Sequence, residues 1–359
     1  MKALIAMSGG VDSAVAALLT RDAGYDCIGC TMRLYDNADA GISRSRTCCS
    51  LDDAEDARSV AYRIGMPHYV FNFTDEFREQ VIGKFIGCYA RGETPNPCID
   101  CNRYLKFGKL LERAKVLGCE SVVTGHYARI EAENGKYYLK KAADRSKDQT
   151  YVLYMLTQAQ LARIRFPLGG LTKTETRRIA EERGFVNAKK PDSQDICFVP
   201  DGDYARVIEL HTGKQAEPGN FVDREGKILG RHQGIIRYTV GQHRGLGLGW
   251  HEPLYVLRID AAKNEVVLGP KEALFSRTLT AADFNWIGGE APSGPIRCAA
   301  KARYRQIEQP ATAEDLGDGR VRVTFDEPQR AVTPGQSAVL YDGDTVLGGG
   351  TILASEGTI

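Results

Sequence analysis

Two cysteines, Cys98 and Cys101, lie in the stretch Thr94–Asn102 (TPNPCIDCN), whose prolines and asparagines are typical of a loop. A C-x-x-C pair in a loop can clip a metal ion, form a redox couple or supply a nucleophile, because the thiolate is both a metal ligand and a strong nucleophile. Two small buried side chains are the alternative. The chain has ten cysteines and no export signal, so in a reducing compartment we favour metal or catalytic use over a disulfide scaffold.

A second candidate site is the string SGGVDS, Ser8–Ser13, which follows an apolar stretch and opens a helix-like one. Gly9 and Gly10 allow a tight turn, and the free N–H groups of a helix start bind anions. The string is neither a Walker A loop nor G-x-G-x-x-G. Asp12 suits a phosphate site only if Mg²⁺ bridges the two or the carboxylate caps the helix. The string therefore predicts a phosphate loop.

The elements that must position these residues alternate over the first two hundred residues. We expect apolar strands at 2–8, 26–35, 67–73 and 121–128, and helices at 12–24, 50–65 and 104–118. This alternation predicts an α/β fold with a doubly wound parallel sheet, whose ligands bind at the carboxyl ends of the strands.

The sequence then changes character. Glycine-rich sequence with short strand-like runs predicts a small mixed central domain, and alternating runs broken by glycine and proline predict a C-terminal antiparallel β-barrel. We predict three domains, at 1–204, 205–272 and 273–359.

Composition narrows the class of protein. The 359 residues are 43% hydrophobic and 26% charged, as in a soluble multidomain protein, and the net charge of +1 requires any nucleic-acid surface to be a local patch. No apolar run reaches the roughly 18 residues of a membrane span, and the first residues are too short for a signal peptide. We expect a cytoplasmic protein without a membrane partner.

Several strings resemble known families. SGGVDS resembles the pyrophosphate (PP) loop of N-type ATP pyrophosphatases, which split ATP into AMP and pyrophosphate and usually adenylate a carbonyl oxygen. In order and spacing, further strings are similar to the bacterial tRNA-uridine 2-sulfurtransferase family: TPNPCIDCNRYLKF (94–107), TGHYARI (124–130), KDQTYVLY (147–154) and DSQDICFV (192–199). TVGQHRGLG (239–247), ARYRQ (302–306) and VTPGQSAVLY (332–341) extend the resemblance over nearly the whole chain.

The resemblance implies an activity and a set of partners. The enzyme would convert the 2-oxo group of the wobble uridine of tRNA to 2-thio, using ATP and Mg²⁺. The tRNA set would be the Lys, Glu and Gln acceptors, and the central domain would bind tRNA. Sulfur would come from a cysteine desulfurase, a relay protein or sulfide.

The resemblance also implies site residues. The sulfur-bearing cysteine would be Cys197 and its partner Cys101. The ATP-binding residues would be Ala6, Met7, Ser8, Gly9, Gly10, Val11, Asp12, Ser13, Met32 and Gly125. The target base would meet Asn96, Pro97 and Cys98. The tRNA contacts would be His126, Lys147, Asp148, Gln149, Arg303, Tyr304 and Gln336.

Cys98 departs from the family pattern, because many members carry an aspartate there that has been interpreted as a general acid or base. A thiol does not replace it simply, since its reference pKa is about 8.5 against about 3.9. Asp100 is two positions away. Cys98, Cys101 and Cys197 together are similar to the three thiolates that hold a 4Fe–4S cluster in other tRNA-thiolating enzymes, with one iron open to sulfide. We favour this cluster hypothesis. A persulfide relay with a Cys101–Cys197 disulfide step, and zinc, are the alternatives.

The remaining cysteines and basic residues carry weaker expectations. Cys27 and Cys30 would lie on opposite faces of a strand. Cys48 and Cys49 could form a second redox pair, whereas Cys88, Cys119 and Cys298 are expected in cores. Residues 301, 303 and 305 would share one strand face suited to a phosphate backbone, with Tyr304 on the other.

Two rival functions stay open. A ligase similar to GMP synthetase would need a glutaminase domain, and this sequence has no nucleophile elbow. A non-catalytic, zinc-bearing RNA-binding protein would leave SGGVDS without a role.

Overall fold

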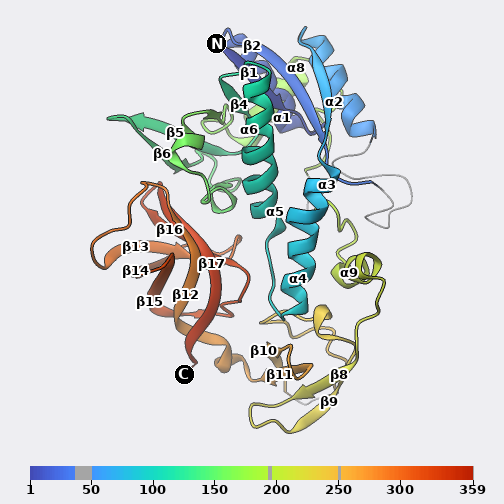
Figure 1. Cartoon of the computed structure of the whole chain (residues 1–359), viewed down its shortest axis with the longest axis vertical. Helices are drawn as coiled ribbons and strands as arrows, with labels where there is room; N and C mark the ends of the chain where they lie inside the picture. The colour runs from blue at the N-terminus through green and yellow to red at the C-terminus, as the bar shows by residue number, and fades with distance from the viewer. Residues whose placement is uncertain (37–50, 193–195, 250–251, 359) are drawn as a thin grey trace.

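A computed structural model describes residues 1–36, 51–192, 196–249 and 252–358 (Figure 1). The predicted parallel sheet is confirmed: five strands lie in the order β3-β2-β1-β4-β7, and every pair is parallel. The strands are β1 (Lys2–Ala6), β2 (Asp26–Arg33), β3 (His68–Asn72), β4 (Ser121–Val123) and β7 (Ile164–Arg165).

Helices cover both faces of this sheet. One apolar cluster joins it to α1 (Val11–Asp22), α2 (Leu51–Arg63) and α8 (Lys173–Glu182). The other joins it to α4 and α6. Cys27 belongs to the first cluster and Cys30 to the second, so these two cysteines lie on opposite faces, as expected. Both are buried, and burial raises the pKa of each thiol.

On the second face of the sheet, the chain forms two helical runs, each made of three consecutive helical segments. The first consists of α3 (Thr74–Phe77), the π-helix η1 (Arg78–Gly83) and α4 (Lys84–Ala90). The second consists of α5 (Pro97–Asp100), the π-helix η2 (Cys101–Lys109) and α6 (Leu110–Val116). Asn96 caps the second run, because its side chain accepts a hydrogen bond from the backbone N–H of Cys98. The C-x-x-C pair is therefore helical, although its prolines predict a loop.

A β-hairpin that the sequence analysis missed follows β4. Strands β5 (Ala128–Glu133) and β6 (Lys136–Lys141) turn at Asn134 and Gly135, both of which have positive φ. An Asn-Gly pair is a strong hairpin signal. Strand β6 pairs with β17 (Thr345–Thr358), so the hairpin extends the antiparallel sheet near the C-terminus. The segment after it contains η3 (Thr150–Val152) and α7 (Gln158–Leu161).

The predicted C-terminal antiparallel β-barrel is confirmed. Six strands run in the order β12-β15-β14-β13-β16-β17, and pairing of β12 with β17 closes the barrel. The strands are β12 (Phe275–Trp286), β13 (Ile296–Lys301), β14 (Gln309–Gly317), β15 (Arg320–Arg330), β16 (Ser337–Asp342) and β17 (Thr345–Thr358). Since β13 ends at Lys301, the expectation that residues 301, 303 and 305 share a strand face is wrong.

Along the chain, a small mixed unit follows the parallel-sheet region and precedes the barrel. It contains α9 and a four-stranded sheet in the order β10-β11-β8-β9, with the short helices η4 and η5 beside it. These elements are α9 (Tyr204–Thr212), β8 (Gly219–Val222), β9 (Ile228–His232), η4 (Ile235–Arg237), β10 (Tyr255–Asp260), β11 (Glu265–Gly269) and η5 (Lys271–Leu274).

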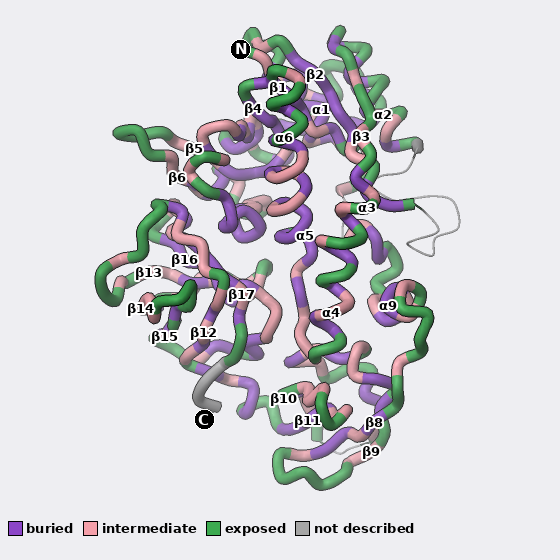
Figure 2. The backbone as a smooth tube through the Cα atoms, viewed as in Figure 1, coloured by how far each residue is buried: buried purple, intermediate pink, exposed green. Residues whose placement is uncertain are grey.

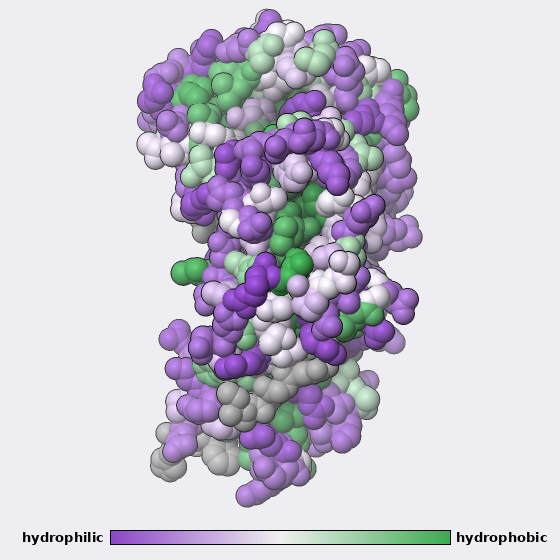
Figure 3. Space-filling model, turned by 90° about the vertical axis from the view of Figure 1, so that its left-hand side faces the viewer, coloured by the Kyte–Doolittle hydropathy of each residue, from purple (hydrophilic) through white to green (hydrophobic). Residues whose placement is uncertain are grey.

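Buried residues concentrate in the parallel sheet, in the helical runs below it and inside the barrel (Figure 2). Hydrophilic residues predominate on the face that carries the β5–β6 hairpin, with small apolar patches between them (Figure 3). Within the described residues, no helix combines the length and the apolar character that a membrane crossing requires.

Candidate active site

The phosphate loop lies between β1 and α1. Gly9 has φ +73°, and a Cβ there would collide with the backbone of Asp53. Gly10 is the N-cap residue of α1. The Ser13 hydroxyl donates to the Gly10 carbonyl at 2.9 Å and accepts from the Ser8 N–H at 3.2 Å. The loop is therefore a fixed, glycine-dependent turn at a helix N-terminus, which is the geometry that binds phosphate.

Gly125 packs directly on the first turn of α1. A Cβ at this position would lie 2.8 Å from the Asp12 carbonyl carbon and 2.8 Å from the Ser13 nitrogen. Two residues later, the Tyr127 hydroxyl donates to Asp12 at 2.9 Å. The backbone of Tyr127 is tied to Gln149 by two hydrogen bonds, at 2.9 and 3.0 Å. The TGHYA and KDQT strings therefore support the phosphate loop from the side.

Four cations beside the loop were not singled out as phosphate-site residues by the sequence analysis. Lys173, the first residue of α8, donates to both carboxylate oxygens of Asp12 at 2.7 and 2.8 Å. Its ammonium also lies 2.7 Å from Asp192, which further pairs with Lys147 at 2.9 Å and Arg177 at 2.8 Å. Burial would raise the pKa of Asp192, but hydrogen bonds from Lys173 and Lys147 lower it to about 2.

The fourth cation, Lys190, approaches the Gly9 carbonyl at 3.4 Å and pairs with Asp53 and Asp56 at 2.5 and 2.7 Å. Asn187 donates to the same carbonyl at 3.0 Å. The T-x-x-E string at 172–175 predicts the start of α8, which has a complete capping box, but no sequence signal identifies the partners of these cations.

Cys101 and Cys197, two of the predicted catalytic cysteines, contact the same apolar cluster. Cys101 is part of the cluster that includes β2 and the residues after it, and Met32 and Cys197 pack against that cluster. The Tyr35 hydroxyl donates to the Cys197 carbonyl at 2.6 Å. Since Tyr35 follows β2 and the phosphate loop follows the adjacent parallel strand β1, Cys197 lies at the edge of the sheet where ligands bind.

The residues of the C-x-x-C segment differ in solvent exposure. Cys98 is exposed, whereas Cys101 and Pro97 are buried, and burial raises the pKa of the Cys101 thiol. Asp100 does not replace the missing aspartate, because it is buried in an ion pair with Lys84 at 2.7 Å. Burial raises the pKa of Asp100 despite the opposing effect of Lys84.

The predicted metal sites were tested against this arrangement. Among the described residues, no three His, Cys, Asp or Glu side chains are grouped to hold a metal ion. Cys98, Cys101 and Cys197 all belong to the described residues, and as placed they do not form an assembled three-thiolate group. Both the cluster and a protein-bound Mg²⁺ stay predictions. Cys48 and Cys49 lie outside the described residues.

The C-x-x-C segment is anchored to the other two units. The Thr94 N–H donates to the Pro334 carbonyl at 2.9 Å, and the Gln336 side chain donates to the Thr94 carbonyl at 2.7 Å. The Thr94 hydroxyl also lies 3.3 Å from that of Thr239 in the central unit. This junction places the segment between sheet, barrel and central unit (Figure 1).

The remaining predicted tRNA contacts are mostly engaged within the protein. Arg303 donates to the backbone carbonyls of Val240 and Ala331, at 2.9 and 2.7 Å. His126 is buried against Phe107 and Phe166, and burial keeps its pKa well below the usual value. Tyr304 packs edge-on against the buried ring of Tyr151. It is 38% exposed, and its pKa is raised by burial and, to a smaller extent, by Asp148 and Cys98.

Asp148 is engaged locally, accepting from the Ala142 N–H at 2.9 Å and the Thr150 hydroxyl at 2.6 Å. As tRNA contacts, all these residues stay predictions.

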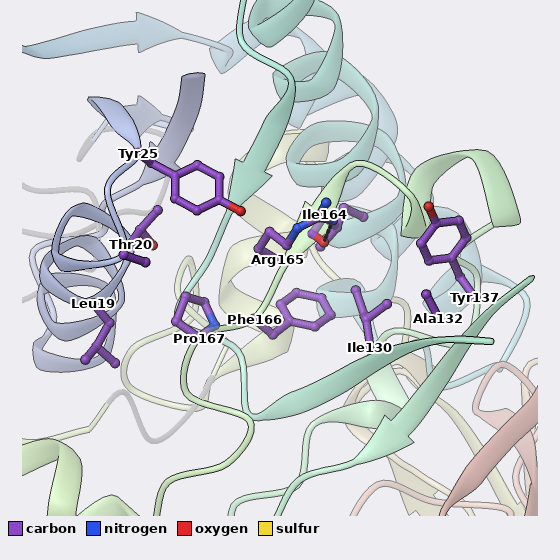
Figure 4. Close-up of a pocket in the computed structure, with 11 residues that line it drawn as sticks. Leu19, Thr20, Tyr25, Ile130, Ala132, Tyr137, Ile164, Arg165, Phe166 and Pro167 are labelled. Atoms are coloured by element: carbon purple, nitrogen blue, oxygen red, sulfur yellow. Dashed lines mark hydrogen bonds between the residues drawn. The ribbon is translucent and has the colours of Figure 1, made fainter. Parts of the chain in front are cut away.

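A pocket of about 520 Å³ lies at the C-terminal end of α1, and its wall includes Phe166, on which His126 packs (Figure 4). It is bounded by the last turn of α1, by Phe166 and Pro167 after β7, and by the β5–β6 hairpin. Its lining is mostly apolar, and it contains the C-terminal end of α1, whereas the phosphate loop is at the N-terminal end. The pocket is therefore separate from the phosphate loop.

Comparison with known proteins identifies the family. The chain matches models of a tRNA methyl transferase HUP domain (residues 1–201), a tRNA methyl transferase PRC-barrel domain (206–270) and an aminomethyltransferase β-barrel domain (276–352). It is 51% identical over 354 residues to the tRNA-specific 2-thiouridylase MnmA of Acetivibrio thermocellus, covering 98% of this chain and 99% of the relative. The MnmA proteins of Geotalea uraniireducens (51% identity; 98% and 94% covered) and Clostridioides difficile (49%; 98% and 98%) are similar over the same length. The chain belongs to the tRNA-specific 2-thiouridylase family.

Proposed function

We propose that this protein is a tRNA sulfurtransferase that replaces the 2-oxo group of the wobble uridine with sulfur, at the expense of ATP. Family membership supports tRNA thiolation and ATP use. The observation that carries the proposal is the shared sheet edge: the phosphate loop follows β1, and Tyr35 after the neighbouring β2 binds the Cys197 carbonyl.

The first step is activation of the base. The O2 oxygen of uridine attacks the α-phosphorus of Mg·ATP, and pyrophosphate leaves. The loop N–H groups at the start of α1, with Ser8 and Ser13, suit the phosphates because they aim fixed dipoles at the developing charge. The oxygen bound to C2 becomes part of AMP, which is a good leaving group.

The second step is sulfur transfer, for which we propose the persulfide relay, because Cys98, Cys101 and Cys197 are not gathered into a metal-binding group among the described residues. The terminal sulfur of a Cys197 persulfide attacks C2, and AMP leaves with the oxygen. The Cys101 thiolate then attacks Cys197 Sγ, which releases the thiolated base and leaves a Cys101–Cys197 disulfide. An external dithiol reduces this disulfide, and a sulfur donor such as a desulfurase reloads Cys197.

The direct test measures AMP, pyrophosphate and 2-thiouridine in one reaction containing tRNA, ATP and a sulfur donor. Products that depend on both tRNA and ATP support the proposal. A protein that binds tRNA but forms neither AMP nor pyrophosphate is a binding module, and the proposal fails. Cys298→Ser, in barrel strand β13, is the matched cysteine control and is expected to retain full activity.

The choice between relay and cluster needs a separate assay. Protein purified without oxygen is analysed for iron and acid-labile sulfide. The relay predicts colourless, iron-free protein that thiolates tRNA. About four irons and four sulfides per chain, lost in Cys98→Ala, Cys101→Ala and Cys197→Ala, would instead establish the cluster.

A further inference from the structure

One group of charges beside the phosphate loop has no role in the steps above. We call Lys147, Lys173, Arg177 and Asp192 the Asp192 cluster, because each cation lies 2.7–2.9 Å from the carboxylate of Asp192. Lys173 also binds both oxygens of Asp12, the second residue of α1. Three cations therefore converge on Asp192, with Asp12 and Asp144 as the other carboxylates beside them, and the cluster adjoins a helix N-terminus that itself favours anions.

The cluster is open to exchange with a ligand. The side chains of Asp192, Arg177 and Lys147 are 26%, 32% and 39% exposed, whereas that of Lys173 is 11% exposed. Because Lys173 joins Asp12 to Asp192, the Asp192 carboxylate lies within two hydrogen-bond lengths of the first turn of α1. A phosphate chain that starts at that turn would extend toward this carboxylate.

We propose that the Asp192 cluster is a second phosphate-binding site, which takes the terminal phosphates of ATP and the pyrophosphate product, and that the Asp192 carboxylate fills this site as an internal substitute when they are absent. Carboxylate and phosphate oxygens accept the same charge-assisted hydrogen bonds from lysine and arginine. No covalent bond changes in this exchange. The inference rests on the proposed function, since it assumes that ATP is the substrate.

The exchange has a consequence for turnover. When pyrophosphate leaves, the cations regain Asp192 at once, so they are not left unpaired in a partly buried site. Competition from Asp192 therefore weakens pyrophosphate binding and favours product release. The low pKa of Asp192, about 2, keeps its carboxylate ionised throughout the working pH range.

Titration of the full-length protein with inorganic pyrophosphate, followed by calorimetry, tests the inference. Asp192→Asn removes the competing charge and is expected to tighten pyrophosphate binding by about 3- to 10-fold, whereas Lys147→Met is expected to weaken it about tenfold. Arg178→Met is the matched control, because Arg178 lies on the same helix and pairs with Glu182 away from the cluster. AMP affinity is expected to stay unchanged in all three variants.

Opposite changes in the two variants separate ligand binding from a structural role, which would weaken AMP and pyrophosphate binding alike. Unchanged or weaker pyrophosphate binding in Asp192→Asn, or unchanged binding in Lys147→Met, overturns the inference. If Asp192→Asn does not fold, Lys147→Met decides, since that lysine is a half-exposed side chain. If the wild-type protein binds neither ATP nor pyrophosphate, the proposed function fails too. If it binds both and the variants match Arg178→Met, only the inference fails.

Discussion

The close approach of Gly125 to the phosphate loop yields a sharp prediction. A Cβ at Gly125 would lie 2.8 Å from the Asp12 carbonyl carbon and from the Ser13 nitrogen. Both atoms belong to helix backbone that cannot rotate aside, so Gly125→Ala must displace either α1 or the 124–127 segment. Overpacking of this kind costs about 1–3 kcal/mol. If that cost falls on the loop geometry, ATP affinity falls by about 5- to 150-fold.

The assay is ATP-dependent AMP formation with tRNA, measured as a function of ATP concentration, together with the thermal midpoint. Gly170→Ala is the matched control, because a Cβ there meets no atom within 4 Å and its φ is not positive. We expect Gly125→Ala to raise the KM for ATP and Gly170→Ala to leave it unchanged. Equal KM values for wild type and Gly125→Ala would refute the reasoning that this glycine keeps the phosphate loop in place.

Three further predictions concern the C-x-x-C segment. Gln336→Ala removes one of the two hydrogen bonds to Thr94 and leaves that of the Pro334 carbonyl, so urea denaturation is expected to show a loss of about 0.5–1.5 kcal/mol. Lys84→Met leaves the buried Asp100 carboxylate unpaired, so the free energy of unfolding falls by about 1–3 kcal/mol at neutral pH. Because the folded-state pKa of Asp100 is already raised, this penalty shrinks as the carboxyl protonates toward pH of about 4. Iodoacetamide is expected to alkylate Cys98 much faster than Cys101 in tRNA-free protein, as measured by mass spectrometry, because Cys98 is exposed and Cys101 is buried.

Each of these predictions has a contradicting result. Lys109→Met is the control for Lys84→Met, since Lys109 pairs with Glu112 on an exposed helix surface. Equal losses of unfolding free energy in the two lysine variants would mean that the Lys84–Asp100 pair contributes no more to stability than an exposed ion pair. Alkylation of Cys101 at the rate of Cys98 would show that the apolar cluster does not protect it. An unchanged unfolding free energy in Gln336→Ala would show that the hydrogen bond from Gln336 to Thr94 does not contribute to stability.

The sheet and the barrel were predictable because each has one dominant period in the sequence. Apolar strands that alternate with capped helices produce β1, β2 and β3 close to the expected ranges, and the parallel pairing follows from the helical crossovers. The β5–β6 hairpin was missed although Asn134-Gly135 signals it, because 121–128 was interpreted as one strand and the residues after 130 were assigned to no element.

The site was predictable in part. The glycines of the phosphate loop are visible in sequence because their conformations exclude other residues. The pairs of Lys173 with Asp12 and of Lys190 with Asp53 are not, since ion pairs between residues more than 130 positions apart leave no local pattern. Arg303 illustrates the opposite error. Its neighbours suggest a basic surface, yet its guanidinium is used to bond backbone carbonyls between two units.

The central claim is that ATP activates the base and Cys197 delivers the sulfur. The most direct measurement is a single-turnover reaction of wild type and Cys197→Ser with ATP, tRNA and a sulfur donor, in which AMP and 2-thiouridine are quantified together. We predict equal amounts of AMP and 2-thiouridine for wild type. For Cys197→Ser we predict AMP without 2-thiouridine. Formation of 2-thiouridine by Cys197→Ser at the wild-type level would contradict the account, because sulfur would then reach the base by a route that bypasses this cysteine.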